Sequence, residues 1–257
     1  PYPYVRPSHF YWSFDYGPVH VTVINQDIDY SPGSAQYQWI ENDLATETKK
    51  WKILLFHKPA WSAGGHPNDT AAQTYIHPLS VNYGVAIAFS GHNHYYSRCE
   101  VDGVQYITSG GGGTTLHTPY PDYPYVKVCE SSHHYWEIDI QGNQLYFRAV
   151  DINGSQIDSF TLVKSVIYVN KDDDSCGGNT PCFTSIQSAI NAAITGTLLQ
   201  VAQGTYTESI VLSSSKSLTL KGGWNSAFNS QTSNTTFVKQ PRATQGSLTL
   251  QVISMKP

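Results

Sequence analysis

Short apolar runs separated by polar turns follow one another through the first 164 residues of the chain. Aromatic and β-branched residues at 11–16 and 19–25 flank Gly17-Pro18, which predicts two strands joined by a tight turn. The runs 51–56 and 85–89 are more strongly apolar and end at glycine- or proline-containing turns, as buried strands do. The first part of the chain is therefore expected to be rich in strands, some of them buried.

Two amphipathic segments predict helices between these strands. Ser34 can cap a helix over 35–44, in which apolar residues recur at helical spacing. Residues 68–80 predict a second helix, which leads from the strand at 51–56 to the strand at 85–89. This order implies a parallel pair of strands with a right-handed crossover. The carboxyl ends of the two strands are then expected to lie side by side.

Beyond these elements, a strand is expected at 104–108, followed by four glycines at 110–113. No Gly-Lys-Ser/Thr follows the glycines, so they are interpreted as a flexible turn rather than a phosphate cradle. His133 and His134 come next and are interpreted as structural residues. Gly-Asn and Asn-Gly turns then divide a three-strand meander, with strands expected at 135–140, 144–150 and 156–163.

The pattern changes near Lys164, which predicts two domains, 1–164 and 165–257. A short helix is expected at 185–193, within a series of short apolar strands at 166–170, 198–202, 208–212 and 217–221. Regularly spaced short strands are typical of a solenoid or a β-sandwich. The second domain is therefore expected to be all-β apart from this helix.

The composition indicates which kinds of partner and which cellular location to expect. Of 257 residues only 13% are charged and the formal net charge is −4, so no nucleic-acid or membrane partner is expected. Abundant Tyr, Thr, Ser, Gly and Asn suit an extracellular protein, secreted or periplasmic. The chain starts at Pro1 with neither an initiator Met nor a signal sequence, and it is expected to be a fragment.

The four cysteines do not form the C-x-x-C pairs of a zinc ribbon or a thioredoxin-type site. One interpretation pairs them in two local disulfides, Cys99–Cys129 and Cys176–Cys182. The other interpretation leaves buried free thiols. The sequence leaves both open.

Histidines follow two of the expected buried strands. His57 comes directly after the strand at 51–56, and Gly91-His92-Asn93-His94 follows the strand at 85–89. A lone histidine is more often structural, but the same position at the ends of two adjacent strands favours a shared site. Neutral imidazoles are good ligands for transition metals. The sequence therefore predicts a metal site at this edge of the sheet.

Three stretches together resemble the calcineurin-like metallophosphoesterases, and among them the purple acid phosphatase type. They are Phe-His-Lys-Pro around His57, Gly-His-Asn-His at 91–94 with Tyr96 and Arg98 behind it, and Trp-Ser-Phe-Asp-Tyr-Gly-Pro-Val-His at 12–20. The resemblance covers the first domain and implies an α/β (α+β) fold, a two-layer β-sandwich flanked by helices, of which this chain would hold the C-terminal half. It also implies a hydrolase that cleaves phosphate monoesters or diesters with two metal ions, drawn from Fe, Zn and Mn.

The same resemblance assigns roles to four histidines. His57 and His92 would bind one metal ion and His94 the other. Two cations about 3.5–4 Å apart can clamp a phosphoryl group and lower the pKa of a bound water. His66 falls where purple acid phosphatases place a substrate-facing histidine, so it is the candidate catalytic residue.

The chain departs from the family pattern because it contains no Gly-Asp dipeptide and no Gly-Asn-His, which carry the family's carboxylate and amide ligands. The upstream half of the catalytic domain is therefore expected to be missing. Neutral imidazoles add no negative charge to offset the repulsion between two cations. The chain alone is expected to hold at most one weakly bound metal ion and to have little or no phosphatase activity.

Three stretches of the second domain resemble the start of a right-handed parallel β-helix of the pectin-lyase-like class. These stretches are 172–182, 186–190 and 201–210. The resemblance implies a short helix that caps the first rung, two or three rungs, and a polysaccharide as a candidate partner. No catalytic residue is assigned there.

Three functions remain open at this point. The first is a secreted dinuclear metallophosphoesterase with a β-helix appendage. The second is a carbohydrate-binding or adhesion module on a degenerate phosphoesterase fold, and the third is a structural zinc held by the histidines. Two Gly-Asp motifs and a Gly-Asn-His upstream in a longer protein would favour the enzyme.

Overall fold

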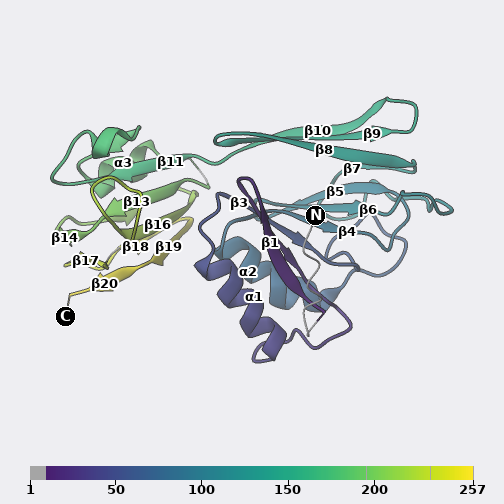
Figure 1. The fold of residues 1–257 in the computed structure, drawn as a ribbon, viewed down its shortest axis with the longest axis horizontal. Coiled ribbons are helices and arrows are strands. Elements are labelled where there is room, and N and C mark those ends of the chain that lie inside the picture. Colours follow the sequence, from purple (N-terminus) through teal and green to yellow (C-terminus); the bar gives the residue numbers. More distant parts are fainter. Residues whose placement is uncertain (1–9, 195, 232, 257) are drawn as a thin grey trace. The chain divides into compact units, whose positions relative to one another are not determined.

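The structure is a computed structural model that describes residues 10–194, 196–231 and 233–256 (Figure 1). The chain divides into two compact units, Pro1–Leu162 and Val163–Pro257. The start of the chain at Pro1, on which the expectation of a fragment rests, lies outside the described residues.

A seven-stranded mixed sheet forms the centre of the first unit, in the order β1-β2-β3-β4-β6-β5-β7. Its strands are β1 (Trp12–Tyr16), β2 (Val19–Val23), β3 (Trp51–Leu55), β4 (Val85–Ser90), β5 (Tyr96–Val101), β6 (Val104–Ser109) and β7 (Val126–Glu130). Strands β2, β3, β4 and β6 run parallel to one another, and β1, β5 and β7 pair antiparallel at the two sides of this group. The expected parallel pair is confirmed as β3 and β4, and the carboxyl ends of four parallel strands meet at one edge of the sheet.

Both predicted helices of this unit are present, and each begins at a side-chain cap. Helix α1 (Ala35–Thr46) starts after Ser34, whose hydroxyl accepts a hydrogen bond from the Tyr37 amide. The second helical segment is a π-helical turn, η1 (Ala72–Ile76), followed by α2 (His77–Asn82). Asp69 Oδ1 accepts hydrogen bonds from the amides of Ala71 and Ala72 at the start of this segment. The π turn has no counterpart in the sequence pattern. Apolar side chains of these helices share a core with one face of the sheet.

The predicted three-strand meander forms a separate sheet in the order β10-β9-β8. Its strands are β8 (His134–Gln141), β9 (Gln144–Asp151) and β10 (Gln156–Val163). Leu145 and Phe147 of β9 are fully buried in one cluster with Trp51 and Ile87 of the main sheet. The first unit is therefore two sheets face to face, with the helices on the far side of the larger sheet (Figure 1).

A buried ion pair joins the two sheets. Arg98 on β5 donates from Nε to Asp158 Oδ2 at 2.7 Å and from Nη2 to Oδ1 at 3.2 Å. The hydroxyl of Tyr96 donates to the same carboxylate at 2.7 Å, and the Asp158 side chain is only 4% exposed. Tyr96 and Arg98, which follow the Gly-His-Asn-His motif, thus hold the sheets together.

The second unit consists of short strands that pair in parallel wherever the structure describes their pairing. One sheet has the order β12-β11-β13-β16-β19, a second β14-β17-β20 and a third β15-β18. The strands are β11 (Val166–Val169), β12 (Cys182–Phe183), β13 (Leu198–Ala202), β14 (Gly204–Tyr206), β15 (Val211–Leu212), β16 (Ser217–Trp224), β17 (Thr235–Phe237), β18 (Arg242–Ala243), β19 (Ser247–Gln251) and β20 (Ile253–Met255). From β13 onward, successive strands visit the three sheets in a fixed repeating order.

The expected strand at 208–212 is present only at Val211–Leu212 (β15), and Glu208 lies outside both β14 and β15. The Glu208 carboxylate is turned toward helix α3 (Ile186–Ala192), where it accepts from the amides of Ile186 and Gln187 at 2.8 and 2.9 Å. A residue committed to capping a helix leaves the strand, which explains the break.

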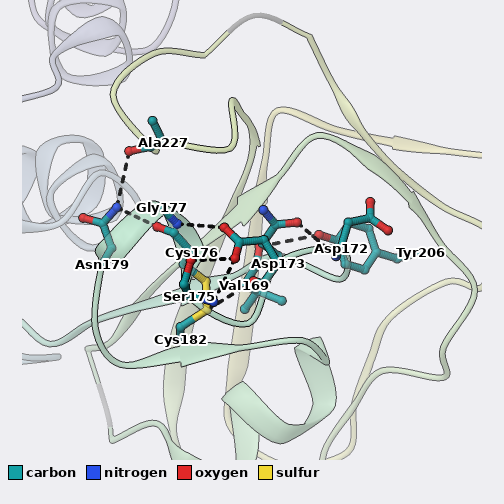
Figure 2. The surroundings of a disulfide bond; sticks show 11 residues. Val169, Asp172, Asp173, Ser175, Cys176, Gly177, Asn179, Cys182, Tyr206 and Ala227 are labelled. Atoms are coloured by element: carbon teal, nitrogen blue, oxygen red, sulfur yellow. Dashed lines mark hydrogen bonds between the residues drawn. A yellow bond between two sulfur atoms is a disulfide. The ribbon is translucent and has the colours of Figure 1, made fainter.

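One of the two proposed disulfides is present. Cys176 and Cys182 are bonded in the first loop of the second unit, where Asp173 accepts hydrogen bonds from the backbone of the same loop (Figure 2). The Cys99–Cys129 disulfide is wrong, because both are free thiols. In the antiparallel register of β5 and β7, Cys129 lies opposite Ser97, and Cys99 opposite Val126, so the two cysteines do not face each other.

No helix among the described residues combines the length and apolar character needed to cross a membrane.

Candidate metal centre

Two predicted ligands lie side by side at the carboxyl ends of β3 and β4. The parallel ladder continues past the strands, with the Phe56 amide donating to Phe89 O and the Gly91 amide to His57 O. His57 Nε2 and His92 Nδ1 are consequently 3.3 Å apart. Two nitrogens bound to one ion at about 2.0–2.1 Å would be about 3.4 Å apart in a tetrahedral site, so this pair fits a shared metal ion.

The motif turn holds His92 in a conformation that is uncommon for a residue with a side chain. His92 has φ +66, in the left-handed region, and the Asn93 amide donates to Gly91 O at 2.7 Å. Such backbone strain costs on the order of 1–3 kcal/mol and clusters at functional sites. The turn places the imidazole of His92 beside that of His57.

Burial, together with the neighbouring imidazoles of His66 and His57, lowers the pKa of His92. The lowered pKa favours the neutral form of His92. Neutral imidazole is the form that ligates a metal ion.

Asn93 is the residue of the motif that sequence reasoning passed over. Its side chain is fully buried, and Oδ1 accepts from the His66 amide at 2.7 Å while Nδ2 donates to Ser62 Oγ at 3.2 Å. A Cβ on Gly65 would lie only 2.8 Å from Asn93 Oδ1, so the loop needs glycine there. Asn93 thereby fixes the loop that places the His66 ring 4.4 Å from the His92 ring.

His94 is held by a different segment, which includes Thr115. Its Nδ1 donates to the carbonyl oxygen of Thr115 at 3.0 Å, which leaves the lone pair of Nε2 available. The ring of His117 stacks on it at 4.2 Å, and His117 is also 5.4 Å from His66. Five imidazoles thus form a continuous row, in the order His57, His92, His66, His117 and His94.

The glycine run packs against the motif instead of forming a flexible turn. A Cβ on Gly110 would lie 2.1 Å from Asn93 O, and one on Gly111 would lie 2.3 Å from Ser132 O. Within this run of four glycines, Gly112 and Gly113 are the two at which an added Cβ would meet no atom. His134 donates from Nδ1 to Ser132 O at 2.8 Å, in keeping with its structural interpretation.

An open cavity of about 400 Å³ lies beside His57 at the same strand ends. Its walls are Val23, Ile24, Leu55, Phe56, His57, Phe89, Ser90, Gly91, Ser109 and Trp136. The predicted ligand His57 is therefore accessible from a hollow with a largely apolar wall.

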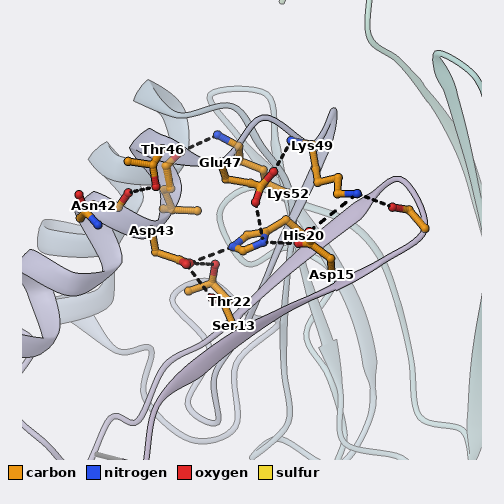
Figure 3. Close-up of polar contacts among 12 residues, drawn as sticks. Ser13, Asp15, His20, Thr22, Asn42, Asp43, Thr46, Glu47, Lys49 and Lys52 are labelled. Atoms are coloured by element: carbon orange, nitrogen blue, oxygen red, sulfur yellow. Dashed lines mark hydrogen bonds and ion pairs between the residues drawn. The ribbon is translucent and has the colours of Figure 1, made fainter. Parts of the chain in front are cut away.

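A second cluster lies where β1, β2 and the end of α1 meet (Figure 3). The His20 ring is 6% exposed, with Nδ1 2.8 Å from Asp15 and 3.1 Å from Glu47, and Nε2 3.0 Å from Asp43. In the part of the chain that the structure describes, Asp15, His20 and Glu47 are the group whose ligand atoms are close enough to hold one cation. Sequence reasoning did not single out this cluster.

Hydrogen bonds and ion pairs to His20 are enough to explain why these side chains lie close together. Burial lowers the pKa of His20, but hydrogen bonds to Asp43 and Asp15 and the charges of Asp43 and Glu47 outweigh burial and raise it overall. The cluster is interpreted as an imidazolium surrounded by three carboxylates.

Part of the first unit is similar to a known protein family. Residues 5–96 match the family model of the calcineurin-like phosphoesterases. This match, together with the similar proteins described below, agrees with the resemblance to the calcineurin-like metallophosphoesterases that the sequence indicated.

The relatives of this chain are purple acid phosphatases. Purple acid phosphatase 18 of Arabidopsis thaliana is 33% identical over 146 residues, which cover 49% of this chain and 33% of that protein. Purple acid phosphatase 22 of the same plant is 27% identical over 198 residues, covering 70% of this chain and 44% of the relative. The chain thus spans less than half the length of these relatives.

Solved structures agree on the fold. A purple acid phosphatase from yellow lupin (Lupinus luteus) seeds has a TM-score of 0.53 at 23% identity, covering 60% of this chain and 32% of that one. GAP50 of Plasmodium, an anchor in the inner membrane complex, has a TM-score of 0.52 at 16% identity, covering 60% of this chain and 54% of its own. At these identities the likeness shows a metallophosphoesterase-like fold with mixed sheets.

Proposed function

We propose that the protein is a metal-dependent phosphoesterase that hydrolyses phosphate monoesters or diesters, and that this chain supplies the imidazole side of a dinuclear centre. The observation that carries the proposal is the 3.3 Å contact between His57 and His92 at adjacent strand ends of a metallophosphoesterase domain. His57 and His92 share one ion, and His94 binds the other through Nε2. His66, whose ring centroid lies 4.4 Å from that of His92, faces the substrate.

The donor set also limits what this chain does alone. All four assigned side chains are imidazoles, which supply nitrogen ligands without negative charge. The motifs that carry carboxylate and amide ligands in the family are not in the sequence. We expect residues 1–257 to hold at most one weakly bound ion and to show little or no phosphatase activity, with the remaining ligands supplied by residues outside this chain.

Hydrolysis of p-nitrophenyl phosphate, a monoester, and of bis(p-nitrophenyl) phosphate, a diester, tests the function. The natural protein that contains this chain, loaded with Zn²⁺, Mn²⁺ or Fe²⁺, should release nitrophenol, and His92→Ala should abolish the release. His77→Asn is the matched control, because His77 contacts Tyr106 and Asp102 instead of the histidine row. A metal-loaded natural protein without turnover would refute the function, and one tightly held zinc would then favour a structural role. Turnover by residues 1–257 that is lost in His92→Ala would refute the expected dependence on outside ligands.

The second unit fits the start of a right-handed parallel β-helix as part of the same proposal. Its support is the fixed order in which successive strands visit three parallel sheets, beside helix α3. The Cys176–Cys182 disulfide and the low share of charged residues support a secreted or periplasmic location.

A carbohydrate-binding or adhesion module is the alternative that this repeating strand order favours. Co-sedimentation of the chain with insoluble polysaccharides tests it directly. Co-sedimentation with a defined polysaccharide, if the natural protein that contains the chain also lacks phosphatase activity, would favour the alternative. Absence of co-sedimentation would count against it.

A further inference from the structure

We propose that His117 is a positioning residue that holds His94 with its Nε2 unprotonated and available to a metal ion. Sequence patterning gave His117 no role. The assignment of Nε2 to a metal rests on the proposed function, whereas the positioning itself rests on contacts within the first unit.

Two reciprocal hydrogen bonds tie the segments of these residues together. The His94 amide donates to Nδ1 of His117 at 3.2 Å, and the His117 amide donates to the carbonyl oxygen of His94 at 2.9 Å. The two rings also stack, with centroids 4.2 Å apart and planes 25° from parallel. His117 therefore contacts both the backbone and the side chain of His94.

The hydrogen bonds fix complementary neutral tautomers. A carbonyl oxygen only accepts, so Nδ1 of His94 must carry the proton that it donates to Thr115, and its Nε2 has a free lone pair. Nδ1 of His117 accepts from an amide, so the proton of His117 is on Nε2. A histidine that donates one ring N–H to a backbone carbonyl is the usual arrangement for a metal ligand, because it orients the ring.

The position of the Thr115 carbonyl depends on His117. Gly112 and Gly113 have no neighbours that a Cβ would meet, and Thr115 is exposed in a segment without regular secondary structure. The contacts made by His117 attach this segment to the motif turn only two residues after Thr115. Loss of the Nδ1 acceptor should therefore release the carbonyl from His94 as well.

The test is an NMR experiment on the whole chain labelled with ¹⁵N-histidine, at a pH where the imidazoles are neutral. Two-bond ¹H–¹⁵N spectra distinguish a ring protonated at Nδ1 from one protonated at Nε2. Wild type should show His94 protonated at Nδ1 and His117 at Nε2. His117→Leu keeps bulk but removes the acceptor, and His94 should then become a mixture of tautomers. His117→Asn, whose Oδ1 can accept from the His94 amide, should restore the single form.

Zn²⁺ alone, added to equivalently labelled natural protein that contains this chain and so has both ion sites, gives the second readout. The concentration that shifts the His94 signals should rise about tenfold or more in His117→Leu, as for loss of other outer-sphere partners. His77→Asn should behave as wild type, and retained His20 signals report folding in every variant. An unchanged His94 tautomer in folded His117→Leu would overturn the proposal, as would a failure of folded His117→Asn to restore it. If Zn²⁺ shifts no histidine signal while the tautomers respond as described, the proposed metal site is refuted. The proposed positioning of His94 by His117 is then still supported.

Discussion

Single residues in the first unit differ in how far the sequence could reveal them. His57, His92 and His94 follow apolar runs directly, so position along the chain was enough to select them. Asn93 and His117 act through contacts with segments more than twenty residues away, and no local pattern marks such contacts. Sequence reasoning therefore found the candidate ligands and missed the residues that hold them in place.

The raised pKa of His20 predicts how the stability of the protein depends on pH. Its pKa is raised above the ordinary value of 6.5 in the folded protein, so the folded state binds this proton more tightly than the unfolded state. The stabilisation is complete below about pH 6.5 and is lost as pH rises through the folded-state pKa. The temperature at the midpoint of thermal unfolding should therefore decrease as the pH is raised from 6 to 9.

His20→Gln provides the comparison for this pH dependence. A glutamine side chain cannot be charged, so the variant should lose this part of the pH dependence and be less stable at pH 6 by about 3 kcal/mol, as for a buried ion pair with one partner removed. Equal slopes for both proteins over this range would contradict the assignment of an imidazolium.

Elements show a second pattern of success and failure. The helix at 35–44, the helix at 185–193 and the three-strand meander follow from capping residues and turn chemistry, and each was confirmed. Strands of two or three residues, such as β14 and β15, are too short to carry a periodic pattern. The break between these two strands depends on Glu208 capping α3, which is distant in the sequence.

The glycine run after β6 gives a matched pair of substitutions at the scale of one turn. Gly110→Ala would place a Cβ 2.1 Å from Asn93 O, a backbone atom of the motif turn that cannot move independently. We expect a loss of about 3 kcal/mol or more, the upper range for overpacking. Gly112→Ala meets no atom and should stay within about 0.5 kcal/mol of wild type. Urea unfolding measures both, and a loss in Gly110→Ala as small as that in Gly112→Ala would show that Gly110 does not pack against the motif turn.

At the scale of the whole molecule, the relevant contacts are those that join sheets within each unit. The sequence predicted parallel strands with histidines at one edge, and the first unit has them. It did not predict that Arg98 and Tyr96 meet Asp158 across the two sheets, because the partners are sixty or more residues apart.

Among the described residues of the first unit, two Arg–carboxylate pairs differ in burial, so their contributions to stability are expected to differ. Asp158→Asn leaves Arg98 without a charged partner between the sheets and should cost about 3–5 kcal/mol. Glu137→Gln breaks the Arg148 pair, whose side chains are 42% and 49% exposed, and should cost less than about 1 kcal/mol. Chemical unfolding of the chain distinguishes them, and similar losses would contradict the role given to Asp158.

Adjacent strand ends bring His57 and His92 together, and we propose that they bind one metal ion. Calorimetric titration of the chain with Zn²⁺ measures this binding, with His92→Ala and His77→Asn titrated in parallel. We expect at most one weakly bound ion per chain, binding unchanged in His77→Asn, and an affinity at least about tenfold lower in His92→Ala. Zinc binding that is the same in His92→Ala as in wild type would show that His92 is not a ligand.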